Sequence, residues 1–366
     1  MAASGVYRRR LHRLAKALER FGLEGVVIVP GPNLTYLTGV RSLLLERPFM
    51  LLVPASGVPS LVAPAFEAGP YERCGATMKI SKWTDSEGSG GAIEEAVRSS
   101  GAKDRWGAEG RAPFLYLHRL RKYSHLRLDD AEPILQGLRE VKDEEEIGLM
   151  KKSGRILSRV YEEMPGLINA GMREDALAKK ISDSIFEHGA SGVEDMLVQF
   201  GERAADPHGL PTKRKLGKGE SIIVDISTRY EGYFADITRT FCLGESKELE
   251  SVYSKVLEAQ ERAISNAGEG VEVGKVDAGA RDVLRKAGLG RYFTHRTGHG
   301  LGLEVHEAPY IVEGGKERLA CGMFFTVEPG AYIPGKLGVR IEDDVMIDDG
   351  RADVITSPPK EYGWWT

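Results

Sequence analysis

The spacing of apolar residues changes repeatedly along the first ~135 residues, from helical periodicity to the short runs typical of strands. Helices are predicted near 6–21, 92–99 and 115–122. Strands are predicted at Gly25–Pro30, Phe49–Pro54, Ser60–Ala63 and Met78–Ser81, with a turn at Gly31–Asn33. Such alternation predicts an α/β domain.

The first helix gives a specific expectation for its two faces. Arg8, Arg9 and Arg10 are expected on the solvated side, and Leu14, Leu18 and Phe21, with Leu11, on the buried side.

The pattern changes near Glu132–Pro133. Residues 143–164 have helical periodicity, with Asp143 and two glutamates in the first turn, where a helix dipole favours acids. A second helix is predicted near 173–188. Hairpins, a helix pair between about 247 and 288 and further hairpins then follow, which is typical of an α+β domain. We place the boundary between about 132 and 142, giving an N-terminal α/β domain over 1–134 and a second domain over 138–366.

The first of two hairpins in the second domain carries paired acids. The apolar run Ser221–Ser227 turns near 230–231 and returns as Tyr233–Phe241. This register predicts that Asp225 directly opposes Asp236, with Cβ atoms about 4.5–5.5 Å apart. Two buried acids at that separation repel each other unless a cation lies between them.

The second hairpin repeats the arrangement. Phe324–Tyr332 turns at Pro334–Lys336 and returns as Val339–Val345, so Glu328 and Glu342 are symmetric about the turn. The alternative for either hairpin alone is a pair of acids on a polar strand face. Two such hairpins beside a histidine cluster favour a shared site with pseudo-twofold symmetry.

Histidines gather in the same domain. His295, His299 and His306 lie within twelve residues, interleaved with three glycines that favour close backbone approach, and His208 precedes the first hairpin. A lone histidine is more often a satisfied polar residue than a ligand, but a run of three favours a site. The H-E-x-x-H zinc pattern is absent.

Four carboxylates and one imidazole form an oxygen-rich ligand set. Such a set suits Mn²⁺ or Co²⁺, and less specifically Fe²⁺ or Zn²⁺. Four acids indicate two divalent ions, about 3.5–4 Å apart, and hence hydrolysis by an activated water, with the histidines moving protons.

Composition narrows the function classes. The formal net charge is −4 and no basic stripe is present, which argues against a nucleic-acid partner. The three scattered cysteines suit a reducing cytosol. No signal peptide and no membrane-spanning run is expected.

The segments around these residues resemble the creatinase/aminopeptidase "pita-bread" family, and within it the Xaa-Pro peptidases. They are VDIS with Asp225, GYFADITRTF with Asp236, HRTGHGLGLEVHEAP, FFTVEPGAY with Glu328 and GVRIEDDV with Glu342. The likeness implies a pita-bread catalytic domain behind a smaller α/β domain and extends over nearly the whole chain.

The resemblance also implies individual roles. Asp225 binds one ion, His299 and Glu328 bind the other, and Asp236 and Glu342 bridge the two. His208, His295 and His306 match substrate-binding and proton-handling positions. Arg340 and Tyr332 match substrate-binding positions near the site, Thr238 supports the ligands, and a homodimer is expected.

The expected substrates are Xaa-Pro dipeptides, with Xaa-Pro aminopeptidase activity on longer peptides as the alternative. Some prolidases carry an arginine directly after the HExP segment, where this chain has Tyr310. A methionine aminopeptidase would not need the first domain, and creatinase lacks the ligands that are complete here. A non-catalytic binding protein of the same fold is the hypothesis from another class.

Overall fold

The structure is a computed structural model that describes residues 3–365 of the chain. The chain divides into two compact units, Met1–Arg139 and Glu140–Thr366. Each unit is described by itself. No helix among the described residues is both long and apolar enough to cross a membrane.

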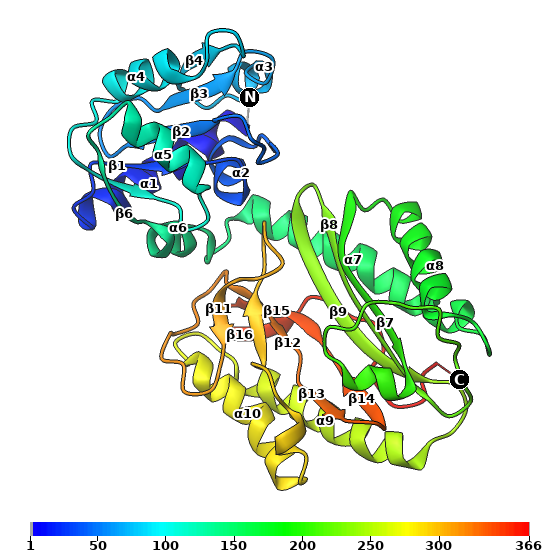
Figure 1. Cartoon of the computed structure of the whole chain (residues 1–366). Coiled ribbons are helices and arrows are strands. Elements are labelled where there is room, and N and C mark those ends of the chain that lie inside the picture. Colours follow the sequence, from blue (N-terminus) through cyan, green and yellow to red (C-terminus); the bar gives the residue numbers. More distant parts are fainter. Residues whose placement is uncertain (1–2, 366) are drawn as a thin grey trace. The chain divides into compact units, whose positions relative to one another are not determined.

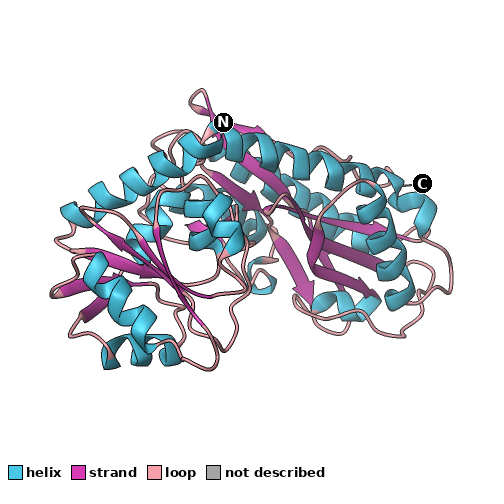
Figure 2. Ribbon diagram, turned by 90° about the horizontal axis from the view of Figure 1, so that it is seen from above, coloured by secondary structure: helices cyan, strands magenta, loops and turns pink. Residues whose placement is uncertain are grey.

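The N-terminal unit is built on a six-stranded mixed sheet with the order β4-β3-β2-β1-β5-β6 (Figure 1). Its strands are β1 (Gly25–Ile28), β2 (Met50–Pro54), β3 (Ser60–Pro64), β4 (Lys79–Trp83), β5 (Arg105–Ala108) and β6 (Arg127–Asp130). Its helices, which surround the sheet (Figure 2), are α1 (Ala3–Arg20), α2 (Pro32–Thr38), α3 (Gly69–Arg73), α4 (Gly90–Ser99), α5 (Phe114–Lys122) and α6 (Glu132–Arg139). The predicted α/β class is confirmed.

Three details of this unit differ from the prediction. Arg10 is buried rather than solvated, because its guanidinium stacks on the Tyr36 ring, 4.3 Å from the centroid. Phe21, expected to be buried, is exposed because it lies beyond the last turn of α1. The predicted turn at Gly31–Asn33 instead begins α2, with Pro32 in the first helical turn, where proline is tolerated.

The C-terminal unit combines four long helices with hairpins. Its helices are α7 (Glu144–Leu167), α8 (Glu174–Glu187), α9 (Lys247–Asn266) and α10 (Val273–Lys286), with short 3₁₀ helices at Gly201–Ala205 and Gly290–Tyr292. Its strands are β7 (Gly192–Phe200), β8 (Ser221–Tyr230), β9 (Tyr233–Cys242), β10 (Gly298–Gly300), β11 (Glu307–Ile311), β12 (Phe324–Val327), β13 (Gly330–Ile333), β14 (Leu337–Arg340), β15 (Asp343–Asp348) and β16 (Arg351–Val354). The predicted α+β class is confirmed.

This unit has two similar halves. In one, α7 and α8 pack on the three-stranded sheet β7-β8-β9 around a core that includes Leu157, Ile181 and Val224. In the other, α9 and α10 pack on the strands from β11 to β15 around a core that includes Val256 and Phe325. The two helix pairs lie on the outside and the curved strands between them (Figure 1).

Buried caps and aromatic contacts fix the ends of this unit. The Asp143 side chain accepts a hydrogen bond from the Glu146 backbone amide, and the Glu146 side chain accepts one from the Asp143 backbone amide. The two bonds form a capping box at the start of α7. At the other end, Trp365 packs edge-on against Phe241 and Tyr253. The C-terminal tryptophan therefore contributes to the core of its own unit.

Candidate active site

A cavity of about 650 Å³ opens between the two halves of the C-terminal unit. All five predicted metal ligands line it, as do His208, His295, His306 and Arg340. Its volume lies in the range of small-molecule pockets, ~300–1,000 Å³. The structure therefore brings together residues that the sequence spreads over more than one hundred positions.

The first hairpin differs in register from the prediction. Asp225 pairs with Thr238 and Asp236 pairs with Ser227, so the two aspartates are diagonal neighbours and are not directly opposed. The reason is the turn, whose two residues are Glu231 and Gly232, both at positive φ, as a tight hairpin turn requires. The predicted pairing is wrong by two positions. Both aspartates still face the same side, because side chains alternate with a period of two.

The second hairpin has the predicted pairing but an interrupted ladder. Val327 pairs with Asp343 and Gly330 pairs with Arg340, so the same register places Glu328 across from Glu342. Both glutamates lie between the β12–β15 ladder and the β13–β14 ladder, outside the bounds of all four strands.

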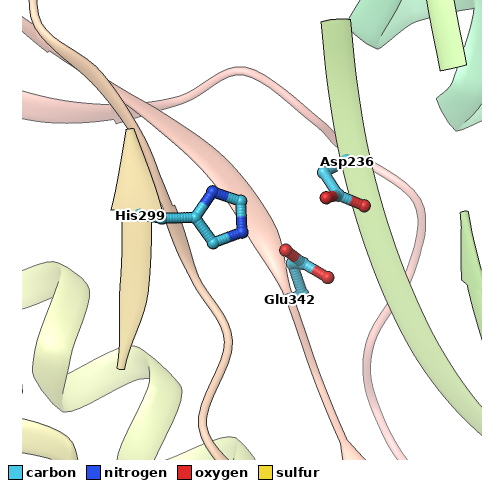
Figure 3. A group of neighbouring side chains, drawn as sticks. All are labelled: Asp236, His299 and Glu342. Atoms are coloured by element: carbon cyan, nitrogen blue, oxygen red, sulfur yellow. The ribbon is translucent and has the colours of Figure 1, made fainter. Parts of the chain in front are cut away.

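The acids and one histidine converge on a common point. Asp236, His299 and Glu342 each offer a ligand atom within 4.8 Å of the others, and the three side chains point toward one another from β9, β10 and the segment before β15 (Figure 3). His299 Nε2 lies 3.2 Å from Glu328 Oε1. The remaining acid, Asp225, forms an ion pair with Arg340.

The geometry fits a cation. Oδ1 of Asp236 is buried and has no hydrogen-bond partner among the residues that the structure describes. Burial raises the pKa of Asp236 well above its usual range, and the negative charges of Asp225 and Asp344 add to this. Burial and the Asp236 charge do the same to the pKa of Glu342. Without a cation, such an acid pair favours the protonated form. A bound positive ion takes the place of the protons and stabilises both acids as carboxylates.

Glu328 is the exception among the acids. Burial alone would raise its pKa, but the hydrogen bond and positive field of His299 outweigh burial and lower the pKa to about 2. Burial of Asp225 raises its pKa, although Arg340 opposes that shift. The site thus contains acids that are already charge-compensated and acids that are not.

Two of the histidines around the acids, His295 and His306, have lowered pKa values. Burial lowers the pKa of His306 to about 4, and the neighbouring His299, whose ring centroid is 4.2 Å away, contributes. Burial also lowers the pKa of His295, whose Nε2 lies 2.9 Å from the hydroxyl of Tyr332. His208 lies on an exposed loop at the cavity wall.

Arg340, Tyr332 and Thr238 form a scaffold behind the ligands. Arg340 donates from Nη1 to Tyr332 Oη at 2.6 Å and from Nε to Thr238 Oγ1 at 3.2 Å. Thr238 Oγ1 in turn donates to Glu342 Oε2 at 2.5 Å. The contact of Thr238 with Glu342 and the ion pair of Arg340 with Asp225 orient two candidate ligands, as metal sites require.

Two charged residues of the cavity were not among the predicted site residues. Asp195 lines the cavity because a β-bulge between Val193 and Met196 keeps it off the core face of β7. No sequence signal marks that bulge. Arg296 also lines the cavity, and its place between His295 and the glycine-rich run was a usable signal.

Comparison with known proteins places these observations in a family. Residues 148–349 match the metallopeptidase family M24, and residues 10–141 match the creatinase/prolidase N-terminal domain. The chain belongs to metallopeptidase family M24. The predicted resemblance is thereby confirmed, and with it the assignment as a metallopeptidase.

Relatives of known structure share both domains. The dipeptidase PepE from Mycobacterium ulcerans is 38% identical with a TM-score of 0.91, covering 98% of each chain. A recombinant prolidase from Thermococcus sibiricus is 37% identical with a TM-score of 0.92, covering 97% of this chain and 98% of that one. The Mycobacterium tuberculosis protein named "Probable dipeptidase PepE" is 38% identical over 361 residues, 97% of this chain and 96% of its own.

Proposed function

We propose that this M24 peptidase is a dinuclear-metal hydrolase that cleaves Xaa-Pro dipeptides. The observation that carries the proposal is the convergence of Asp236, His299 and Glu342 within 4.8 Å of one another, in a cavity that Asp225 and Glu328 also line. One buried oxygen of Asp236 has no hydrogen-bond partner among the described residues. Similarity to a prolidase and to dipeptidases supports the substrate class.

In this proposal Asp225 would hold one ion, His299 and Glu328 would hold the other, and Asp236 and Glu342 would be ligands shared by both. Carboxylate and imidazole donors without thiolate suit Mn²⁺ or Co²⁺, with Fe²⁺ or Zn²⁺ also compatible. Bound ions of this kind lower the pKa of a water molecule and polarise the scissile carbonyl.

The histidines supply the proton transfers. His306 lines the cavity with its ring centroid 4.2 Å from that of His299, so a neutral ring nitrogen can accept a proton there. The same nitrogen can return that proton to the amine that leaves when the peptide bond breaks. His295, oriented by Tyr332, can donate a hydrogen bond to the carbonyl oxygen as negative charge develops on it.

Three peptides test the substrate class. Metal-loaded protein is incubated with Ala-Pro, Ala-Pro-Ala and Met-Ala-Ala, and products are quantified by chromatography. The proposal expects cleavage of Ala-Pro. Cleavage of Ala-Pro-Ala alone would make the chain an Xaa-Pro aminopeptidase, and cleavage of Met-Ala-Ala alone would remove the proline requirement. Folded, metal-loaded protein without turnover on any peptide would favour a binding protein.

The proposal also includes a homodimer and a location in the cytosol. The family resemblance supports the homodimer. The three cysteines, which form no disulfide in the structure, support the reducing cytosol. Light scattering of the purified protein would test the dimer, and a monomeric mass would contradict it.

A further inference from the structure

The cavity contains two arginines in opposite situations. Arg340 is committed to the scaffold, because its three guanidinium nitrogens donate to Thr238, Tyr332 and Asp225. The guanidinium of Arg296 forms no hydrogen bond or ion pair with any described residue, and only its backbone carbonyl contacts the His295 ring. Its guanidinium instead lies over the ring of Tyr310, 4.5 Å from the centroid. A positive group in a substrate cavity is thus held in place without being neutralised.

The ladder between β10 and β11 explains where that group is held. Tyr310 pairs with His299, so both side chains lie on the same face of the sheet. Arg296 belongs to the segment that precedes β10; it lines the cavity, and its guanidinium lies over the Tyr310 ring. Arg296 therefore lies beside a candidate metal ligand, in a cavity that His306 also lines.

This position matches the chemistry of a short substrate. In a dipeptide a single carbon atom separates the carboxylate from the nitrogen of the scissile bond. In a longer peptide the same place is taken by an uncharged amide. A guanidinium offers a planar pair of N–H donors that fits a carboxylate, and stacking on an aromatic face leaves those donors free at the edge.

We propose that Arg296 binds the C-terminal carboxylate of the substrate and thereby selects dipeptides over longer peptides. The inference rests on the proposed peptidase function, which it deepens by naming the residue that measures substrate length. Tyr310 acts as a positioning residue, because its ring sets the direction of the guanidinium.

Arg296→Gln tests the proposal with an acid and amide pair of substrates. kcat and KM are measured for Ala-Pro and for its C-terminal amide with Mn²⁺-loaded protein. The wild type should prefer the acid. The variant should lose about 10- to 100-fold in kcat/KM on Ala-Pro, mainly through KM, as expected for one charge-assisted contact. Its kcat/KM on the amide should change less than about twofold. Arg296→Lys should fall between, because it keeps the charge without the planar fork.

The chain offers a matched control. Arg291 likewise lies over an aromatic ring, 4.7 Å from the centroid of Tyr292, and also donates to the Tyr292 hydroxyl at 2.6 Å. It is exposed and does not line the cavity. Arg291→Gln should leave both substrates unaffected. Equal losses on the acid and the amide in Arg296→Gln would show a structural role and overturn the proposal, as would a wild type without preference for the acid.

Two additions separate this inference from the proposed function. If wild type cleaves no proline peptide, the proposed specificity fails, and Ala-Ala with its amide takes the place of the first pair. Calorimetric binding of L-proline and prolinamide gives a readout without turnover. The acid should bind wild type more tightly and lose about tenfold in Arg296→Gln. Indifference of L-proline binding to the substitution would overturn the role of Arg296.

Discussion

Both units of the molecule bury acids, but they stabilise them differently. In the N-terminal unit Glu109 accepts from the Val29 amide at 2.6 Å and from Asn33 Nδ2 at 3.1 Å, and both carboxylate oxygens are thereby satisfied. In the C-terminal unit Asp236 has a buried oxygen without a partner among the described residues and shares its surroundings with four other acids: Asp225, Glu328, Glu342 and Asp344. A buried acid is therefore not by itself a metal site. The crowding of several acids around an unpartnered oxygen makes the difference.

Substitution of one of the crowded acids in the C-terminal unit should have the largest effect on activity. Asp236→Asn and Glu342→Gln each remove one of the two proposed bridging charges while keeping side-chain size. Activity on Ala-Pro should fall by on the order of 10³-fold or more, because both ions lose a shared ligand. Circular dichroism should show a retained fold, and steady-state kinetics gives the loss. Turnover within tenfold of wild type in either variant would refute the bridging roles.

Glu109→Gln tests the buried acid of the N-terminal unit, whose two carboxylate oxygens both accept hydrogen bonds. Burial raises the pKa of Glu109 to about 7, from a usual value of 4.5. A raised pKa means that the folded state binds the proton more tightly. Glu109 therefore contributes stability that is complete below pH 4.5 and is lost as pH rises to about 7. The wild type should lose about 3 kcal/mol through this group over that window, and Glu109→Gln should not.

Urea unfolding at several pH values measures that difference. Glu94→Gln is the control, since Glu94 is an exposed acid of the same unit. Metal content and kcat should be unchanged in Glu109→Gln. A metal-dependent phenotype at this position would erase the distinction between the two kinds of buried acid.

Thr238→Val is a smaller perturbation that sharpens the comparison. The substitution removes the hydroxyl that orients Glu342 but leaves all proposed ligands in place. Mn²⁺ affinity should fall about tenfold or somewhat more, the usual effect of removing a group that orients a ligand. Thr228→Val is the matched control, because the Thr228 hydroxyl donates to the Gly192 carbonyl on the neighbouring strand. Equal affinities for Mn²⁺ in the two variants would remove the supporting role of Thr238.

Much of this arrangement was readable from the sequence because strand geometry tolerates some errors. The register of the first hairpin was wrong by two positions, yet an even error keeps Asp225 and Asp236 on one face. An odd error would have sent one of them into the core. The second hairpin was read correctly because Gly335 adopts the positive φ that a turn favours.

The rest depended on contacts between distant segments. Neither the bulge that presents Asp195 nor the commitment of Arg340 to Asp225 leaves a local pattern. The burial of Arg10 likewise depends on Tyr36, which lies on another helix. Periodicity reports which face of an element is buried, but not which long side chains find a partner there.

Metal stoichiometry tests the central claim most directly. Metal-free protein is titrated with Mn²⁺ by calorimetry, and the dialysed product is analysed by elemental mass spectrometry. Two ions per chain are expected for wild type and for Glu109→Gln, with weakened binding of both in Asp236→Asn. A single ion, or stoichiometry that Asp236→Asn leaves unchanged, would contradict the shared dinuclear centre.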